Sequence, residues 1–229
     1  MRINKYLAHS GVCSRRQADE IVAQGRVSIN GEIVKELGTK VTPEDVVKLD
    51  GKLLFPSEKF KYYLLNKPVG YVSTVKDPYA EKTVIELIDS NERLYPVGRL
   101  DKDSRGIIII TNDGNLTYKL THPKKDIFKT YEVTLDKKPK EIDLEKLRKG
   151  IPMDGYLTKR AKIKKISSYK YQISISEGKN RQVRRMFDYI GCKVIDLKRI
   201  SIGQLQDNNL PEGKFRELKK EEIDYLRSL

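Results

Sequence analysis

The sequence predicts an α+β fold in which a small N-terminal module precedes a larger domain with a mixed, largely antiparallel sheet. The chain has 229 residues, enough for a medium-sized domain and a small companion with separate cores. In the larger part the predicted strands and helices do not alternate regularly, which argues against a βα-repeat fold. Four consecutive isoleucines at 107–110 predict a strand that is buried on both faces.

Residues 1–55 predict the small module. Ser14 and Gln17 form a capping box for a second helix, which Gly25 ends. The Asn30-Gly31 pair predicts a hairpin between two short strands, and a further strand follows near residues 46–51. The apolar residues that indicate the two helices are Ile3, Tyr6 and Leu7 in the first, and Ala18, Ile21 and Val22 in the second.

The polar segment 56–61 contains a proline and predicts a linker, so we expect the larger domain to span residues 62–229. Its apolar patterns and turn residues predict a series of strands and helices. The predicted strands are 62–66, 106–111, 128–135, 157–166, 169–176 and 193–202, and the predicted helices are 115–121, 141–149 and 181–190.

The charge of the chain indicates a polyanionic partner. The formal net charge is +14, which is more than solubility requires. Residues 1–55 contain nine Lys or Arg and seven Asp or Glu, so residues 56–229 hold 37 of the 46 basic and 25 of the 32 acidic side chains. The larger domain therefore carries most of the positive potential expected to attract a nucleic acid.

Other classes of protein fit the composition less well. No apolar segment approaches the roughly 20 residues needed to span a bilayer, and the start has no apolar signal region, so we expect a cytoplasmic protein. Cys13 and Cys192 lack the spacing of a disulfide framework or zinc site, and His9 and His122 are the only histidines. We therefore expect no metal and chemistry based on carboxylates and tyrosines.

Arg15 and Arg16 lie in the first turn of a capped helix, where the helix dipole disfavours cations. They either extend into water or bind a phosphate together with the exposed helix N–H groups. The segment RINKYLAHSGVCSRRQADEIVAQGRVSINGEIV resembles the S4 RNA-binding domain over essentially the whole module. The resemblance implies an RNA-binding surface on the two helices, with the candidates Arg2, Lys5, Ser14, Arg15 and Arg16.

The stretch VGRLDKDSRGIIIITNDG, residues 97–114, places carboxylates and guanidiniums directly before the buried strand. A strand fixed on both faces is a rigid base for the preceding loop, where a carboxylate could act as nucleophile or base. A charged turn before a strand is also commonly a solvated turn. The charged residues between Arg99 and Arg105 are therefore candidates that need further support.

Two further segments carry candidate residues. In the helix predicted at 181–190, an apolar stripe leaves Arg181 and Arg185 pointing away and Arg184 at the border, where it can reach a cleft. The alternative is an ordinary amphipathic helix with a solvated basic face. Tyr131 shares a strand face with Val133, so it is either a core residue or a residue at a cleft edge.

Together these segments resemble the RsuA/RluB/RluF family of ribosomal RNA pseudouridine synthases. The resemblance covers nearly the whole chain and includes long motifs in the family order. These motifs are the S4 module, LNKPVGYVST at 65–74, YPVGRLDKDSRGIIIITNDG at 95–114, KTYEV at 129–133 and EGKNRQVRRMF at 177–187.

The resemblance implies roles for several residues. Asp101 of the motif GRLD falls on the catalytic nucleophile or base, Tyr131 on the active-site tyrosine, and Arg184 on the arginine that pairs with the aspartate. Arg99 is implied in filling the space left by the displaced base, while Asp103 has no implied role. The remaining implied residues are Leu100 and Val183 in the substrate pocket and Lys67, Arg181 and Arg185 as RNA contacts.

The implied reaction converts uridine to pseudouridine in ribosomal RNA, and we expect the large subunit to be the substrate and no cofactor to be needed. The alternatives are a small-subunit substrate and a non-catalytic RNA-binding or ribosome-assembly factor; a duplex-DNA binder fits less well because no helix-turn-helix or zinc signature is present. The intact Gly98–Asp101 motif favours an enzyme. We expect a monomer that acts on ribosomal RNA or a pre-ribosomal particle, with no membrane partner.

Overall fold

The computed structural model describes residues 1–57, 59–206 and 209–229. The chain divides into two compact units, one formed by residues 1–60 with 90–93 and the other by residues 61–89 with 94–229. The predicted linker at 56–61 spans the point where the first unit gives way to the second, and its residue Glu58 lies outside the described residues. None of the helices within the described ranges has the length and apolar character needed to cross a bilayer.

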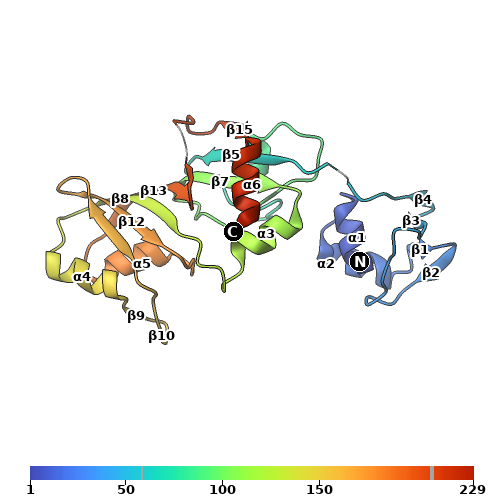
Figure 1. Ribbon diagram of the computed structural model, residues 1–229, viewed down its shortest axis with the longest axis horizontal. Coiled ribbons are helices and arrows are strands. Elements are labelled where there is room, and N and C mark those ends of the chain that lie inside the picture. The colour runs from blue at the N-terminus through green and yellow to red at the C-terminus, as the bar shows by residue number, and fades with distance from the viewer. Residues whose placement is uncertain (58, 207–208) are drawn as a thin grey trace. The chain divides into compact units, whose positions relative to one another are not determined.

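The smaller unit has the two helices and the hairpin that the sequence predicts (Figure 1). The Ser14 hydroxyl accepts a hydrogen bond from Gln17 N, and Asn30 and Gly31 both have positive φ in the hairpin turn. The predicted apolar residues form its core, with Ile21 only partly buried. Its elements are α1 (Ile3–His9), α2 (Arg15–Ala23), β1 (Val27–Ile29), β2 (Glu32–Val34), β3 (Val47–Leu49) and β4 (Lys52–Leu53), with strand order β2-β1-β3-β4.

The larger unit is built on a mixed sheet with strand order β11-β12-β8-β13-β7-β5-β15. Every neighbouring pair in this order is antiparallel except β13 and β7, as the sequence predicts for a largely antiparallel sheet. Its strands are β5 (Tyr62–Lys67), β6 (Tyr95–Pro96), β7 (Arg105–Thr111), β8 (Lys129–Leu135), β9 (Pro152–Met153), β10 (Tyr156–Leu157), β11 (Lys162–Lys165), β12 (Lys170–Ile175), β13 (Val194–Ile202), β14 (Leu205–Gln206) and β15 (Phe215–Glu217).

The helices of this unit are α3 (Gly114–Thr121), α4 (Glu141–Lys149), α5 (Gln182–Tyr189), α6 (Lys220–Ser228) and the 3-10 helix η1 (Val84–Leu87). Helices α3 and α6 lie side by side in Figure 1, while α5 packs on β13 and α4 on β11. Asp113 caps α3 by accepting hydrogen bonds from the backbone N–H groups of Asn115 and Leu116. A carboxylate at this position also interacts favourably with the helix dipole.

The prediction of one strand at 157–166 is wrong. The chain forms the short β10, turns back towards the end of α4, and only then enters β11. Thr158 causes the break, because its N–H donates to Ile151 O at 2.9 Å and its hydroxyl accepts from Ile151 N at 2.9 Å. These bonds direct residues 158–161 away from a continuous strand.

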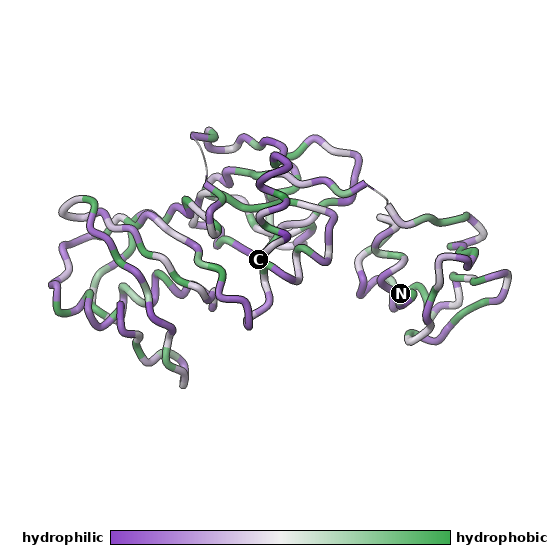
Figure 2. Tube along the Cα trace, in the orientation of Figure 1, coloured by the Kyte–Doolittle hydropathy of each residue, from purple (hydrophilic) through white to green (hydrophobic). Residues whose placement is uncertain are grey.

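Strand β7 is the most deeply buried part of the sheet. Ile107, Ile108, Ile109 and Ile110 are all 0% exposed, and the middle of the strand is hydrophobic in Figure 2. β5 and β13 lie on its two sides, so neither edge of the strand faces solvent. The loop that leads into β7 therefore has a rigid attachment at one end.

Candidate active site

The acidic loop, residues 98–104, is held by the segment that precedes it in sequence. Ser73 Oγ donates to Leu100 O at 2.9 Å and accepts from Leu100 N at 3.0 Å. Gly70 N donates to Lys102 O at 2.8 Å. Asp101 lies between these two attachment points, so its backbone is fixed on both sides. This is the preorganisation that a catalytic carboxylate needs.

Lys67 holds the backbone at the C-terminal end of the same loop. Its side chain is 0% exposed, and Nζ donates to Pro68 O at 2.8 Å and to Ser104 O at 2.6 Å. Burial lowers the pKa of this ammonium to about 8, although the charges of Asp103 and Asp101 oppose that shift. The prediction that Lys67 contacts RNA is therefore wrong, because a fully buried ammonium bonded to two carbonyls does not reach a backbone phosphate.

Arg181 is the guanidinium closest to Asp101. Its Nη1 lies 3.9 Å from Asp101 Oδ2, and its two terminal nitrogens donate to both carboxylate oxygens of Asp103 at 3.0 and 2.8 Å. The backbone of Arg181, at the start of α5, has φ 49° and ψ 29°. A residue with a side chain rarely adopts this left-handed conformation, which costs about 1–3 kcal/mol and is concentrated at functional sites.

Arg184 pairs with a different carboxylate from the one predicted. Its Nε lies 3.4 Å from Asp103 Oδ2, and Nη2 donates to Asp103 O at 2.8 Å and to Ser104 Oγ at 3.3 Å. Nη1 donates to Val194 O at 3.1 Å. Within the described residues Arg184 forms no ion pair with Asp101, so the predicted pairing is wrong. Arg184 is instead a buried side chain that holds the C-terminal end of the loop.

Asp103, which had no implied role, therefore organises the loop. Hydrogen bonds from Arg181 are the main cause that lowers the pKa of its carboxyl, with further help from the charge of Arg184. Burial opposes the shift. The carboxylate thus stays charged well below neutral pH and joins the start of α5 to the loop that carries Asp101.

A cavity of about 420 Å³ opens beside the first residues of this loop. Arg99 lies on its wall together with Gly98, and Tyr131 lies on the side formed by the sheet. Strands β7, β8 and β13 contribute side chains, and residues 120–125 and 176–179 complete the wall. The cavity is large enough to receive a ligand the size of a nucleotide.

Tyr131 is both a core residue and a cavity residue. It is 8% exposed and belongs to the hydrophobic cluster with Val133, yet it also lines the cavity. Its register partner on β13 is Arg199, whose side chain lines the same cavity. Sequence reasoning missed Arg199, although an arginine two residues after the buried Leu197 of an alternating strand is a signal that could have identified it.

Of the residues predicted to line the substrate pocket, one lies on the cavity wall and two lie elsewhere. Arg99 is exposed on the cavity wall, whereas Leu100 and Val183 lie in the hydrophobic core and outside the cavity lining. On α5, Arg185 is paired with Asp154. Within the described residues, no group of three or more His, Cys, Asp or Glu side chains has the arrangement of a metal site.

In the smaller unit, Arg2, Arg15 and Arg16 are exposed, while Lys5 and Ser14 are partly buried. The first turn of α2 contains no acidic residue. The two arginines there thus lie beside free helix N–H groups without a carboxylate of the same turn, an arrangement that suits a phosphate.

Comparisons with known proteins agree with both resemblances seen in the sequence. The family described as RNA pseudouridylate synthase matches residues 61–189, and the S4 domain matches residues 1–47. Ribosomal large subunit pseudouridine synthase B of Bacillus subtilis is 42% identical over 100% of this chain and 96% of its own length. Dual-specificity RNA pseudouridine synthase RluF of Escherichia coli K12 is 40% identical over 97% of this chain and 77% of its own length.

A solved structure is also similar over the whole length. The crystal structure of a pseudouridylate synthase matches with a TM-score of 0.73 and 35% identity, covering 99% of each chain. The similarity therefore extends through both units.

Proposed function

The chain belongs to the RNA pseudouridine synthase family, and on this premise we propose that it isomerises a uridine of large-subunit ribosomal RNA with Asp101 as the reacting carboxylate. The substrate assignment is supported by the Bacillus subtilis relative, whose name specifies the large ribosomal subunit. We further propose that the protein acts as a monomer on ribosomal RNA or a pre-ribosomal particle in the cytoplasm.

The observation that carries the role of Asp101 is its placement on a fixed loop whose first residues, Gly98 and Arg99, line the cavity, although Asp101 itself lies outside the lining. Hydrogen bonds hold the backbone on both sides of it, and Arg181 Nη1 lies 3.9 Å from its carboxylate. Its side chain is 32% exposed, so a substrate can reach it. A reachable carboxylate with a guanidinium nearby is suited to nucleophilic attack.

The reaction exchanges bonds within one nucleoside. The bond between N1 and C1′ breaks and a bond between C5 and C1′ forms, while N1 gains a proton and C5 loses one. Asp101 attacks either C1′ of the ribose, which it leaves as the C5–C1′ bond forms, or C6 of the ring, which it leaves by elimination when C5 loses its proton and the C5–C6 double bond is restored. The atoms and electrons balance without an external oxidant or reductant.

The remaining groups assist binding. The uridine must leave its stack at a cost of a few kcal/mol, which contacts to phosphate can offset. Tyr131 on the cavity wall offers a ring face for the displaced uracil, and the exposed Arg99 can occupy the vacated position in the RNA.

The test replaces the carboxylate by its neutral isostere. Asp101→Asn should reduce isomerisation by at least about 10⁴-fold, as expected for loss of a covalent nucleophile, while RNA affinity changes only a few-fold. Tritium release from RNA labelled at C5 of uridine measures turnover. Asp224→Asn, an exposed carboxylate on α6, is the control and should retain activity. Turnover by Asp101→Asn near the wild-type rate would remove Asp101 from this role.

The substrate is tested separately. Pseudouridines are mapped in ribosomal RNA from cells with and without the protein, and we expect one or a few large-subunit positions to lose the modification. Loss confined to the small subunit would assign the alternative substrate instead.

A further inference from the structure

Arg199 is a buried guanidinium with unused hydrogen-bonding capacity. Its side chain is 2% exposed, and Nε donates to Ile107 O at 2.8 Å. Nη2 is buried and has no hydrogen-bond partner among the residues that the structure describes. A buried cationic donor left without an acceptor is costly, so such a group is retained where a ligand satisfies it.

Lys129 lines the cavity next to it. Lys129 lies two residues before Tyr131 on β8, and Tyr131 is the register partner of Arg199, so Lys129 and Arg199 are diagonal neighbours on one sheet face. Burial, followed by the charge of Arg199, lowers the pKa of the Lys129 ammonium. We refer to Lys129 and Arg199 as the cation pair.

No carboxylate neutralises the cation pair within ion-pair distance in the described part of the chain. Glu177 is the one carboxylate among the residues lining the cavity, and its Oε1 already accepts from Lys159 N at 2.9 Å and from Gln182 Nε2. Two adjacent cations in a partly dry site repel one another, and an incoming anion would relieve that repulsion.

The backbone around Arg199 is shaped to keep it in place. Gly106 is its partner on the parallel strand β7, with φ +109°. A Cβ at Gly106 would overlap the backbone N and O of Arg199. The glycine thus permits the close approach of β13 and β7 that fixes the guanidinium over the cavity.

We propose that Lys129 and Arg199 bind a backbone phosphate of the target uridine nucleotide. They do so on the side of the cavity formed by β8 and β13, which we call the cavity floor. The inference rests on the proposed function and adds to it a fixed anchor for the displaced nucleotide. A phosphodiester matches the cation pair better than a uracil oxygen does, because its negative charge answers both cations whereas a carbonyl satisfies one donor.

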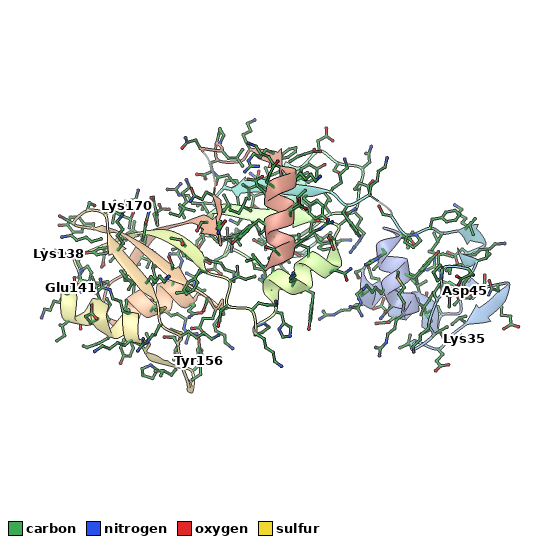
Figure 3. The ribbon with its side chains drawn as sticks, viewed as in Figure 1. Lys35, Asp45, Lys138, Glu141, Tyr156 and Lys170 are labelled. Carbon is green, nitrogen blue, oxygen red and sulfur yellow. The ribbon has the colours of Figure 1, made fainter. Side chains whose placement is uncertain are left out.

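The test measures RNA affinity by fluorescence anisotropy, with the full chain and the RNA segment identified by mapping. Arg199→Gln and Lys129→Gln should each weaken binding about tenfold, as expected for loss of a charge-assisted bond. Because both cations bind the same phosphate, each variant should also reduce the slope of log K against log salt, by at most about 0.7–0.9, the value for one phosphate contact. Lys138→Gln is the control, an exposed lysine that Figure 3 places beside α4 at the far end of the sheet from α3.

A second arm changes the RNA. A neutral methylphosphonate linkage replaces the phosphate on the 5′ or the 3′ side of the target uridine. At one of the two positions it should weaken binding by the wild-type protein about as much as Arg199→Gln does, and should have no further effect on that variant.

The outcomes separate the possibilities. The proposal would be overturned if the methylphosphonate at either linkage weakened binding by Arg199→Gln as much as it weakens binding by the wild-type protein. It would also be overturned by an unchanged salt slope in both variants. Weakened binding with an unchanged slope would indicate a uracil oxygen as the acceptor. If Arg199→Gln fails to fold, the partly buried Lys129→Gln decides the matter. Because binding is read without turnover, absence of isomerisation would count against the proposed function and leave this result standing.

Discussion

The acidic loop and the cavity floor both contain cations, but in opposite electrostatic states. At the loop, Arg181 and Arg184 are matched by the carboxylate of Asp103, with Asp101 close to Arg181. On the floor, Lys129 and Arg199 face the cavity without a carboxylate partner among the described residues. Basic side chains thus hold the acidic loop to α5, whereas basic side chains in the cavity remain available to a ligand.

A basic helix can have its positive charge matched by carboxylates of the same unit. Arg181, Arg184 and Arg185 on or beside α5 are all engaged with carboxylates of the larger unit. The exposed ion pairs of Arg181 and Arg185 contribute little stability, so their main effect is to fix geometry. Unmatched positive charge, rather than total positive charge, is the better guide to where a phosphate binds.

The sharpest way to break the comparison is to disturb β7, the strand that follows the acidic loop and lines the cavity with Ile109. Gly106→Ala should lower the free energy of unfolding by about 3 kcal/mol or more, because the new Cβ overlaps the backbone of Arg199 and the positive φ disfavours a side chain. Urea denaturation followed by circular dichroism measures the change.

Gly155→Ala is the matched control. Gly155 also has a positive φ, of +77°, but nothing lies within 4 Å of its ideal Cβ position. It should cost about 1 kcal/mol from the backbone alone. Equal costs at the two glycines would mean that β7 and β13 do not need their close approach.

The second prediction removes the charge that matches the loop arginines. Asp103→Asn leaves Arg181 and Arg184 without their shared carboxylate, so the loop that carries Asp101 loses its ionic link to the start of α5 and Asp101 is held less well in position. We expect kcat to fall about 100-fold with KM changed only a few-fold, as for loss of positioning. Steady-state tritium release gives both constants.

Asp188→Asn provides the comparison, since Asp188 is an exposed carboxylate near the same arginines that forms no ion pair with them in the described part of the chain. It should leave kcat within about twofold, in line with a surface substitution away from the chemistry. A fall of the same size in both variants would assign the effect to general charge and not to the pairing at Asp103.

A third prediction uses the buried ammonium beneath the loop. The pKa of Lys67 is about 8 in the folded chain and 10.5 ordinarily, so the folded state releases the proton at lower pH. Between these values the unfolded chain binds more protons, and the stability of the folded state should therefore rise with pH. Below pH 8 the cost of burying the charge is present in full.

Compared with Lys67→Met, the wild-type protein should gain about 2 kcal/mol of stability between pH 8 and 10. Denaturation at a series of pH values measures the difference, in which other titrating groups cancel. A difference that stays flat or declines over this range would show that Lys67 keeps its proton in the folded state.

Local features of the fold could be predicted from the sequence, whereas pairings between distant segments could not. The Ser14 capping box, the Asn30-Gly31 hairpin and the buried isoleucine strand each depend on neighbouring residues. Helix α6 escaped prediction because its nine residues bury only Leu226. A helix this short and this polar depends on contacts elsewhere for its stability.

In the candidate site, too, local motifs could be predicted from the sequence and contacts between distant segments could not. The motif around Asp101 was recognisable, but which carboxylate Arg184 meets depends on how a loop without periodicity faces α5, and the answer is Asp103. Lys67 was expected to contact RNA, but it is buried and donates to the carbonyl of Ser104, 37 residues away. Such contacts follow from the assembled sheet and leave little trace in local sequence.

The comparison also extends to the smaller unit, where Arg15 and Arg16 are exposed and form no ion pair with the residues that the structure describes. Replacing both by Ala should reduce the slope of log K against log salt by up to about 1.8 and weaken RNA binding by only several-fold. The loss should be similar for different RNA sequences, because phosphate contacts position the RNA and do not read its bases.

Lys35→Ala with Lys48→Ala is the control, since it removes the same charge from the strand side of this unit, where Figure 3 labels Lys35. If the slope falls equally in both double variants, the small unit attracts RNA only through its net charge. If it falls only for Arg15 and Arg16, the helix start is a phosphate site, and charge left unmatched by the fold marks RNA contact in both units of the chain.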